Sequence, residues 1–179
     1  MGHCCEQYAA QNKKKSVTLT FKRAELLYDL SNYSFIEGDI LPQDQEHARH
    51  QVFDIVQDGN VDRVTRILNL SHSECVELLY PYAKEEISYA GEILHDVLQE
   101  NKEYKIVLSL PATFSMTTVK LLEHLIHEFL VCSVLADWLS IPLPSSAAHW
   151  GEKVENLRTK IRTSLVSRTD RVRRKLKPF

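Results

Sequence analysis

The stretch "SMTTVKLLEHLIHEFLVCSVLADWLS", residues 115–140, predicts the element around which the rest of this chain folds. Apolar residues recur in it at intervals of three and four, which is the period of an α-helix. The stripe comprises Val119, Leu122, Ile126, Phe129, Leu130, Val134 and Trp138, and it is widened by Leu121, Leu125, Val131 and Leu135. A helix that is apolar over so much of its circumference is typical of the centre of a helical bundle.

A second long helix is predicted after the prolines of residues 141–144, from Pro144 or Ser145 to about Arg168. Its apolar positions, again three and four apart, are Ala147, Trp150, Val154, Leu157, Ile161 and Leu165. One face is therefore expected to pack on the bundle. The charged side chains of the other face are Lys153, Arg158, Lys160 and Arg162.

Shorter helices are predicted before this pair, at residues 22–33, 45–58, 61–70 and 83–100. Gly38 and Pro42 have the composition of a turn, so the first helix is expected to end before them. Ser71 and Glu74 match a capping box, which predicts that a separate helix starts at Ser71.

Two segments have the residue pattern of β-strands. "SVTLTF" (16–21) places Val17, Leu19 and Phe21 on one side, and "EYKIVLSL" (103–110) is rich in apolar residues, among them Ile106, Val107 and Leu108. Because a lone strand is not stable, the two are expected to pair with each other or with a neighbouring subunit.

The predicted fold class is therefore mainly α: a helical bundle with a long central apolar helix, a small two-stranded β element and extended charged termini. The predicted organisation is a flexible N-terminal arm (1–15), one bundle domain (16–167) and a basic C-terminal tail (168–179). Apolar content of 44% and charged content of 26% are ordinary for a globular chain of 179 residues.

The net charge of −2 hides an asymmetry along the chain. Residues 1–150 carry 12 Lys and Arg against 21 Asp and Glu, and residues 151–179 carry 10 against 3, which gives −9 and +7. The candidate partner-binding residues of the tail are Arg168, Arg171, Arg173, Arg174, Lys175, Lys177 and Phe179. Three interpretations stay open: a solvated helix end, binding of nucleic acid, or docking on an acidic protein surface such as a neighbouring copy.

No catalytic motif is found in the sequence. A nucleophile elbow, a glycine-rich phosphate loop and a Cys-x-x-Cys pair are all missing. Cys75 and Cys132 lie in apolar helical patterns and are expected to be inert core residues. The prediction is a non-enzyme that uses no cofactor.

Two clusters resemble metal ligands without completing a site. His124 and His127 share a helix face beside Glu123 and Glu128, but a dimetal bundle needs matching Glu-x-x-His motifs on other helices. Glu46 with His50 and Glu92 with His95 are only loose echoes of that motif, which favours a polar helix face. The "HCC" run at residues 3–5 has no fourth ligand. No metal is predicted, and no membrane segment, because neither a signal peptide nor an apolar run of 18 residues is found.

Several segments together resemble a known family. They are "TFKRAELLYDLSNYSFIEGDI" (20–40), "GNVDRVTRILNLSHSECVELLYPY" (59–82), "LLEHLIHEFLVCSVLADWLSIPLPSSAAHWGEKVENLR" (121–158) and "VRRKLKPF" (172–179). Their order is similar to that of head–tail connector (adaptor) proteins of tailed bacteriophages, as encoded in phages and prophages of Bacteroidales.

The resemblance implies a structural virion protein that is assembled in the bacterial host cytoplasm. It implies a homo-oligomeric ring beneath the portal, with the portal protein and neighbouring tail or connector proteins as partners and packaged DNA nearby. The strand residues Val17, Leu19, Phe21, Ile106, Val107 and Leu108 would then augment strands of a neighbouring subunit. Two alternatives are a small helical nucleic-acid-binding or regulatory protein that uses the basic tail, and a metal-dependent bundle enzyme around His124 and His127.

Overall fold

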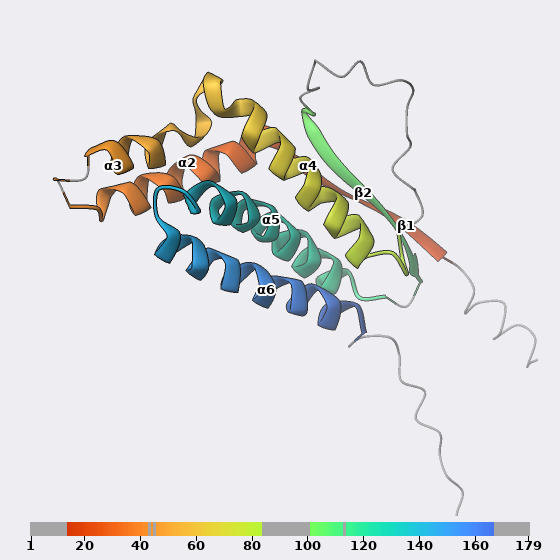
Figure 1. Cartoon of the computed structure of the whole chain (residues 1–179). Coiled ribbons are helices and arrows are strands. Elements are labelled where there is room, and N and C mark those ends of the chain that lie inside the picture. The colour runs from red at the N-terminus through yellow and green to blue at the C-terminus, as the bar shows by residue number, and fades with distance from the viewer. Residues whose placement is uncertain (1–13, 43, 45, 84–100, 113, 167–179) are drawn as a thin grey trace, which may run out of the picture.

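The computed structural model describes residues 14–42, 44, 46–83, 101–112 and 114–166. In chain order these form β1 (Lys14–Lys22), α2 (Arg23–Asp39), α3 (Glu46–Phe53), α4 (Val61–Leu78), β2 (Glu103–Pro111), α5 (Met116–Leu139) and α6 (Pro144–Val166). Two 3-10 turns, Asp54–Val56 and Asp58–Asn60, connect α3 to α4 (Figure 1). The prediction of a mainly helical chain with a small two-stranded sheet is confirmed.

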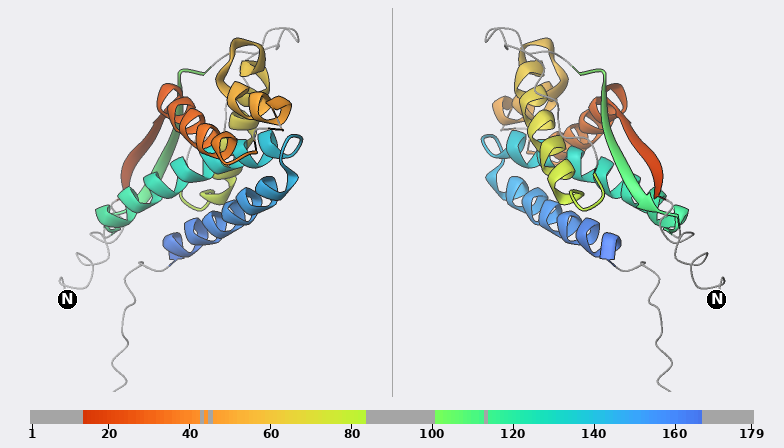
Figure 2. Two further views of the ribbon diagram at one scale, coloured as in Figure 1. Left: turned by 90° about the vertical axis from the view of Figure 1, so that its left-hand side faces the viewer. Right: turned by 90° about the vertical axis from the view of Figure 1, so that its right-hand side faces the viewer.

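Helix α5 is covered by other helices on several sides. Its most extensive contacts are with α6, which runs antiparallel beside it, and α4 and α2 pack on its remaining sides (Figures 1 and 2). Four consecutive residues, Phe129, Leu130, Val131 and Cys132, are fully buried. Because successive helical residues point about 100° apart, this run shows that α5 is enclosed around most of its circumference there.

The sheet lies along α4. Strands β1 and β2 are antiparallel, with Val17 opposite Leu108, Leu19 opposite Ile106 and Phe21 opposite Tyr104. The core-facing side chains of the sheet are Leu19, Phe21, Tyr104, Ile106, Leu108 and Leu110. Tyr104 donates from its hydroxyl to Asn69 Oδ1 of α4 at 3.1 Å, so a polar contact fixes the position of α4 against the sheet.

A buried arginine joins the sheet to two helices. Arg23 follows β1 directly and is only 6% exposed. Its guanidinium donates to Thr65 Oγ1 of α4 at 2.9 Å, and its backbone N–H donates to the Lys102 carbonyl at 3.0 Å. A charge buried this deeply is tolerated only where hydrogen bonds compensate its desolvation, so this junction positions β1, α2 and α4 relative to one another.

Some predicted boundaries are wrong. Helix α4 is continuous from Val61 to Leu78, so Ser71 lies inside it and begins no new helix. Ser71 is 4% exposed, and its small side chain is accommodated in the core, which outweighs its local preference for a helix start. Helix α3 ends at Phe53, and the predicted helix to residue 58 is replaced there by 3-10 turns.

Helix α2 also continues past the predicted break, through Gly38 to Asp39. A side chain on Gly38 would place its Cβ 2.6 Å from Cε1 of Phe53, so the glycine lets α3 approach α2 closely. Gly38 is thus a packing residue within the helix.

Several predictions fall wholly or largely outside the described residues. They are the helix at residues 83–100, the arm (1–15), from which only Lys14 and Lys15 are described at the start of β1, and the tail (168–179). No helix in the described parts of the chain is long and apolar enough to cross a membrane.

Replacing Gly38 by alanine should destabilise the protein. The new methyl group would displace the Phe53 ring, which stacks on Phe35 with centroids 5.6 Å apart, and we expect the free energy of unfolding to fall by about 1–3 kcal/mol. Chemical denaturation measures the change. Gly151→Ala is the matched control: nothing lies within 4 Å of its added Cβ in α6, so a gain of about 0.5–1 kcal/mol is expected. Equal changes in the two variants would contradict the close packing at Gly38.

Candidate functional site

The two edges of the sheet differ. Beyond β2, Ala83 forms a β-bridge with Leu108, and the Ser109 N–H donates to the Tyr82 carbonyl at 2.6 Å. Beyond β1, no backbone group of the described residues pairs with the strand. Among the described residues, the outer edge of β1 is therefore an open edge, and its central residues 16–21 carry no charge.

The six strand residues predicted to join subunits all lie in this sheet. Leu19, Phe21, Ile106 and Leu108 point into the core of the same chain, whereas Val17 and Val107 are half-buried. Of the two pairings left open by the sequence, the intrachain pairing is formed. A role of these six residues in contacts between subunits stays a prediction. Such contacts can form at the edge of β1 that does not pair with β2.

The two histidines of "HLIH" have different environments. His127 Nε2 lies 2.7 Å from Asp29 Oδ2 of α2, while His124 is exposed. Glu128 points to α6, where its Oε2 is 3.5 Å from Lys153 Nζ. Within the described ranges, no three His, Cys, Asp or Glu side chains gather as metal ligands would. The "HCC" run lies outside the described residues.

Both described cysteines are buried. Burial raises the pKa of Cys132 to about 11 and raises the pKa of Cys75 further. Because the thiolate is the reactive form, neither thiol is a good nucleophile near neutral pH.

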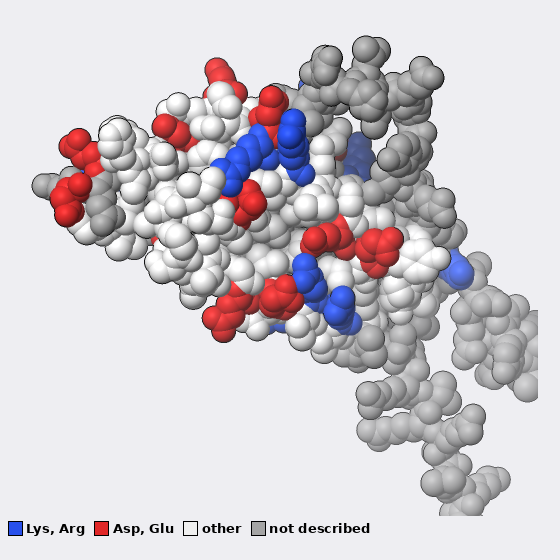
Figure 3. Space-filling model, in the orientation of Figure 1, with Lys and Arg blue, Asp and Glu red and all other residues white. Residues whose placement is uncertain are grey.

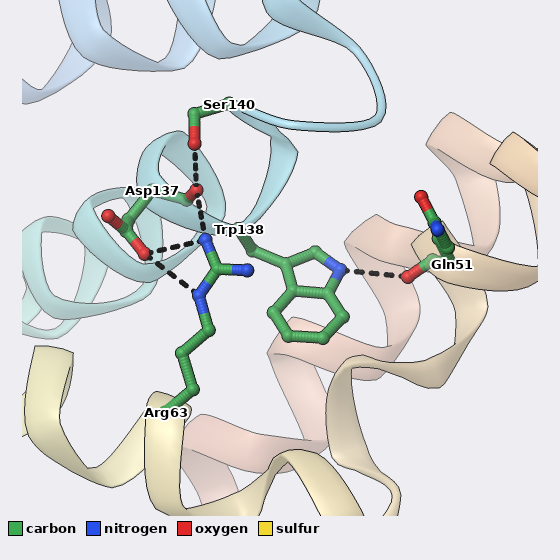
Figure 4. Close-up of polar contacts among 5 residues, drawn as sticks. All are labelled: Gln51, Arg63, Asp137, Trp138 and Ser140. Atoms are coloured by element: carbon green, nitrogen blue, oxygen red, sulfur yellow. Dashed lines mark hydrogen bonds and ion pairs between the residues drawn. The ribbon is translucent and has the colours of Figure 1, made fainter.

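A small pocket of about 220 Å³ lies where the C-terminal end of α5 meets α3 and the start of α4. Arg63 and Trp138 line it, and Figure 4 shows the two side chains next to each other. The Arg63 guanidinium lies 5.0 Å from the centre of the Trp138 ring and donates to Asp137 at 3.0 Å (Oδ2) and 2.8 Å (backbone carbonyl). Trp138 donates from Nε1 to the Gln51 carbonyl at 3.1 Å. Through Asp137 and Trp138, the "ADWL" residues thus hold the end of α5 against α4 and α3.

Lys153 occupies an aromatic and acidic cluster between α2, α5 and α6. Its Nζ lies 4.7 Å from the centre of the Trp150 ring and 5.4 Å from that of Tyr33. Trp150 donates to Glu37 Oε1 at 3.0 Å. Burial lowers the pKa of Lys153, but nearby Cys132, Glu128 and Tyr33 outweigh it, so the pKa is raised and the ammonium is retained. A cation stacked on two rings holds α6 to α2.

An open groove of about 730 Å³ lies between α4 and α6. Its walls combine Leu70, Leu78, Tyr80 and Pro81 with Ser73, Glu74, Glu77, Arg158 and Arg162. Arg158 donates to Glu74 Oε2 at 2.9 Å across it, so the charges of the groove largely balance.

Comparisons of the chain with family models, with curated proteins and with solved structures found no match.

Sequence reasoning missed three of these features. The periodicity of α6 predicts Lys153 on its charged face, opposite the apolar one, yet Lys153 lies in an aromatic cluster. The Arg63–Trp138 contact and the groove between α4 and α6 join residues far apart in the chain. The alternation of apolar and polar residues in "SVTLTF" predicts the strand β1, whose outer edge is described above.

Arg63 should contribute measurably to stability. Arg63→Ala removes the hydrogen bonds to Asp137 and the stacking on Trp138, so we expect the free energy of unfolding to fall by about 1–2 kcal/mol. The control is Arg66→Ala in the same helix, whose side chain is exposed, and a change below about 0.5 kcal/mol is expected. If urea denaturation gave the same loss of unfolding free energy for both variants, a stabilising role of the Arg63 contacts with Asp137 and Trp138 would be contradicted.

Cys132 should resist alkylation in the native protein. Raising its pKa from near 9 to about 11 lowers the thiolate fraction at pH 8 by about a hundredfold, and burial slows access further. Timed alkylation with iodoacetamide, read at this residue by mass spectrometry, measures the rate. The unfolded chain in urea is the control, and equal rates in both states would contradict the raised pKa.

Proposed function

We propose that this chain is a non-enzymatic structural subunit that assembles with copies of itself into a ring. The ring proposed is a head–tail connector beneath the portal of a tailed phage, so that the chain is a virion protein with the portal and adjoining tail or connector proteins as partners. The observation that carries the assembly role is the open outer edge of β1.

An open strand edge is a template for pairing with another chain, and natural proteins that stay monomeric usually block it. Lysines are the usual block, but in β1 they lie only at the ends, at Lys14, Lys15 and Lys22. The middle of the strand, residues 16–21, consists of serine, threonine and apolar residues that favour strand structure. This composition supports strand addition by a neighbouring subunit.

The arrangement of the helices fits the same proposal. In it, α5 is the long central apolar helix of the bundle, and the sheet on one side of α4 is the part that reaches the neighbour. The resemblance of residues 20–40, 59–82, 121–158 and 172–179 to phage connectors supplies the more specific identity.

The mass of the full chain in solution tests the assembly role. We expect light scattering to give a multiple of the 20.7 kDa subunit mass and negative-stain images to show closed rings. Mixing with the isolated portal protein tests the partner. A monomer at all concentrations, which also stays unbound to the portal, would contradict the proposal. A monomer that binds DNA in a salt-dependent way would instead favour the nucleic-acid-binding alternative.

Lysines introduced along the open edge should disrupt assembly. Thr18 and Thr20 are exposed on β1, and the double variant Thr18→Lys, Thr20→Lys places two charges where a neighbouring strand would pair. We expect its association to weaken at least about tenfold. The matched control, Thr159→Lys with Thr163→Lys on the exposed face of α6, makes the same chemical change away from the sheet. Unchanged assembly of the β1 variant would exclude this edge as the interface.

A further inference from the structure

The outer face of α2 gathers exposed apolar side chains. Among the described residues, nine large apolar residues are exposed, and four of them lie on α2 or directly after it: Tyr28, Phe35, Ile36 and Ile40. The opposite face of the same helix is buried through Leu26 and Leu30. A monomer rarely exposes such a group of side chains together, and where it does, the surface commonly binds a partner.

The same region is acidic. Residues 24–48 contain six acidic residues and no Lys or Arg: Glu25, Asp29, Glu37, Asp39, Asp44 and Glu46. Figure 3 shows acidic side chains at the end of the molecule where α2 joins α3. No basic residue lies in the last turn of α2, although the helix dipole favours cations there. Arg49 reaches Asp39 at 3.1 Å, but one arginine leaves this end negative.

Residues 167–179 have the complementary composition. The segment "SRTDRVRRKLKPF" contains six Lys and Arg against one Asp. Val172, Leu176 and Phe179 recur among the cations at intervals of four and three. Both the charge and the interspersed apolar residues therefore match an acidic surface that carries exposed apolar side chains.

The acidic end of α2 lies beside the start of α6, whereas residues 167–179 follow the last residue of α6 in the chain. Trp150, near the start of α6, contacts Glu37 of α2 at 3.0 Å. Val166 ends α6 sixteen residues later, which is about 24 Å along a helix axis. A contact between one copy's segment and another copy's α2 is therefore head-to-tail, and repetition of such a contact closes a ring or extends a filament.

We infer that the outer face of α2 is the docking surface for residues 167–179 of a second copy of this chain. The apolar residues of the segment cover Tyr28, Ile36 and Ile40, and its cations neutralise the carboxylates at the C-terminal end of α2. The inference rests on the proposed ring and names the surface and the segment that join its subunits.

A peptide titration tests the docking contact directly. The probe is a fluorescein-labelled peptide of residues 165–179, added to a full chain that carries Arg171→Glu, Arg173→Glu and Arg174→Glu, so that its own segment does not compete. We expect saturable binding that weakens as salt is added. Adding Ile36→Lys and Ile40→Lys to the chain should weaken it at least about tenfold.

Matched variants control for folding and for general charge. Leu70→Lys with Leu121→Lys makes the same change at two exposed apolar residues elsewhere, and should leave peptide affinity within about twofold. Circular dichroism checks that each variant is folded, and Tyr28→Ser with Ile36→Ser replaces the lysine pair if that pair does not fold. Absence of peptide binding, or equal binding by the α2 variant and the control, would overturn the inference.

Mixing two defective full chains tests the head-to-tail geometry. The variant with a charge-reversed segment keeps its α2 surface, and the variant with lysines on α2 keeps its segment. Alone, each should fail to assemble through this contact. With Thr18→Lys and Thr20→Lys added to both chains, so that the edge of β1 does not contribute, the two together should form a one-to-one complex that grows no further, because only one functional contact remains. Absence of that complex would exclude docking on a second copy.

These outcomes distinguish a failure of the docking contact from a failure of the proposed ring. If the wild-type chain forms rings and both variants still do, the docking contact is wrong and the proposed ring stands. If the wild-type chain forms no ring but the peptide and the mixed chains bind as expected, the docking contact stands and the ring is wrong.

Discussion

Burial of α5 is the constraint on which the rest of this structure depends. The run of four fully buried residues from Phe129 to Cys132 requires partners around most of the helix, and one neighbouring helix cannot supply them. Helix α6, which follows α5 directly in the chain, covers one side of it, and α4 and α2 cover the others. Each of these helices buries one face in doing so and leaves the other to solvent, which is why the charged and exposed residues lie on their outer sides.

Polar contacts fix the angles at which these helices meet. Arg23 connects the end of β1 to α4, Arg63 and Trp138 connect α4 and α3 to the end of α5, and Lys153 connects α6 to α2. In each case a cation or an indole N–H binds a partner from a distant part of the chain. Apolar packing alone tolerates rotation and sliding of helices, so these directional contacts give the bundle a defined geometry.

The surface of the molecule has two features that the fold itself does not use. One is the open edge of β1, and the other is the apolar and acidic outer face of α2. Both have the character of surfaces that bind other chains, one through backbone hydrogen bonds and the other through apolar contact and charge. Two different surfaces of this kind are consistent with the proposed ring, in which each copy contacts two neighbours.

The sequence by itself determined the helices at α5 and α6, the two strands, and the opposite charges of residues 1–150 and 151–179. These properties follow from periodicity and composition, which act within a short segment. Only the tertiary structure decided that β1 pairs with β2 across 80 intervening residues, that Ser71 and Gly38 continue their helices, and that Lys153 is held between aromatic rings. It also decided which face of α2 stays uncovered. Periodicity shows which residues of a helix lie on one side, but the partner that covers that side is chosen by the packing of the whole chain.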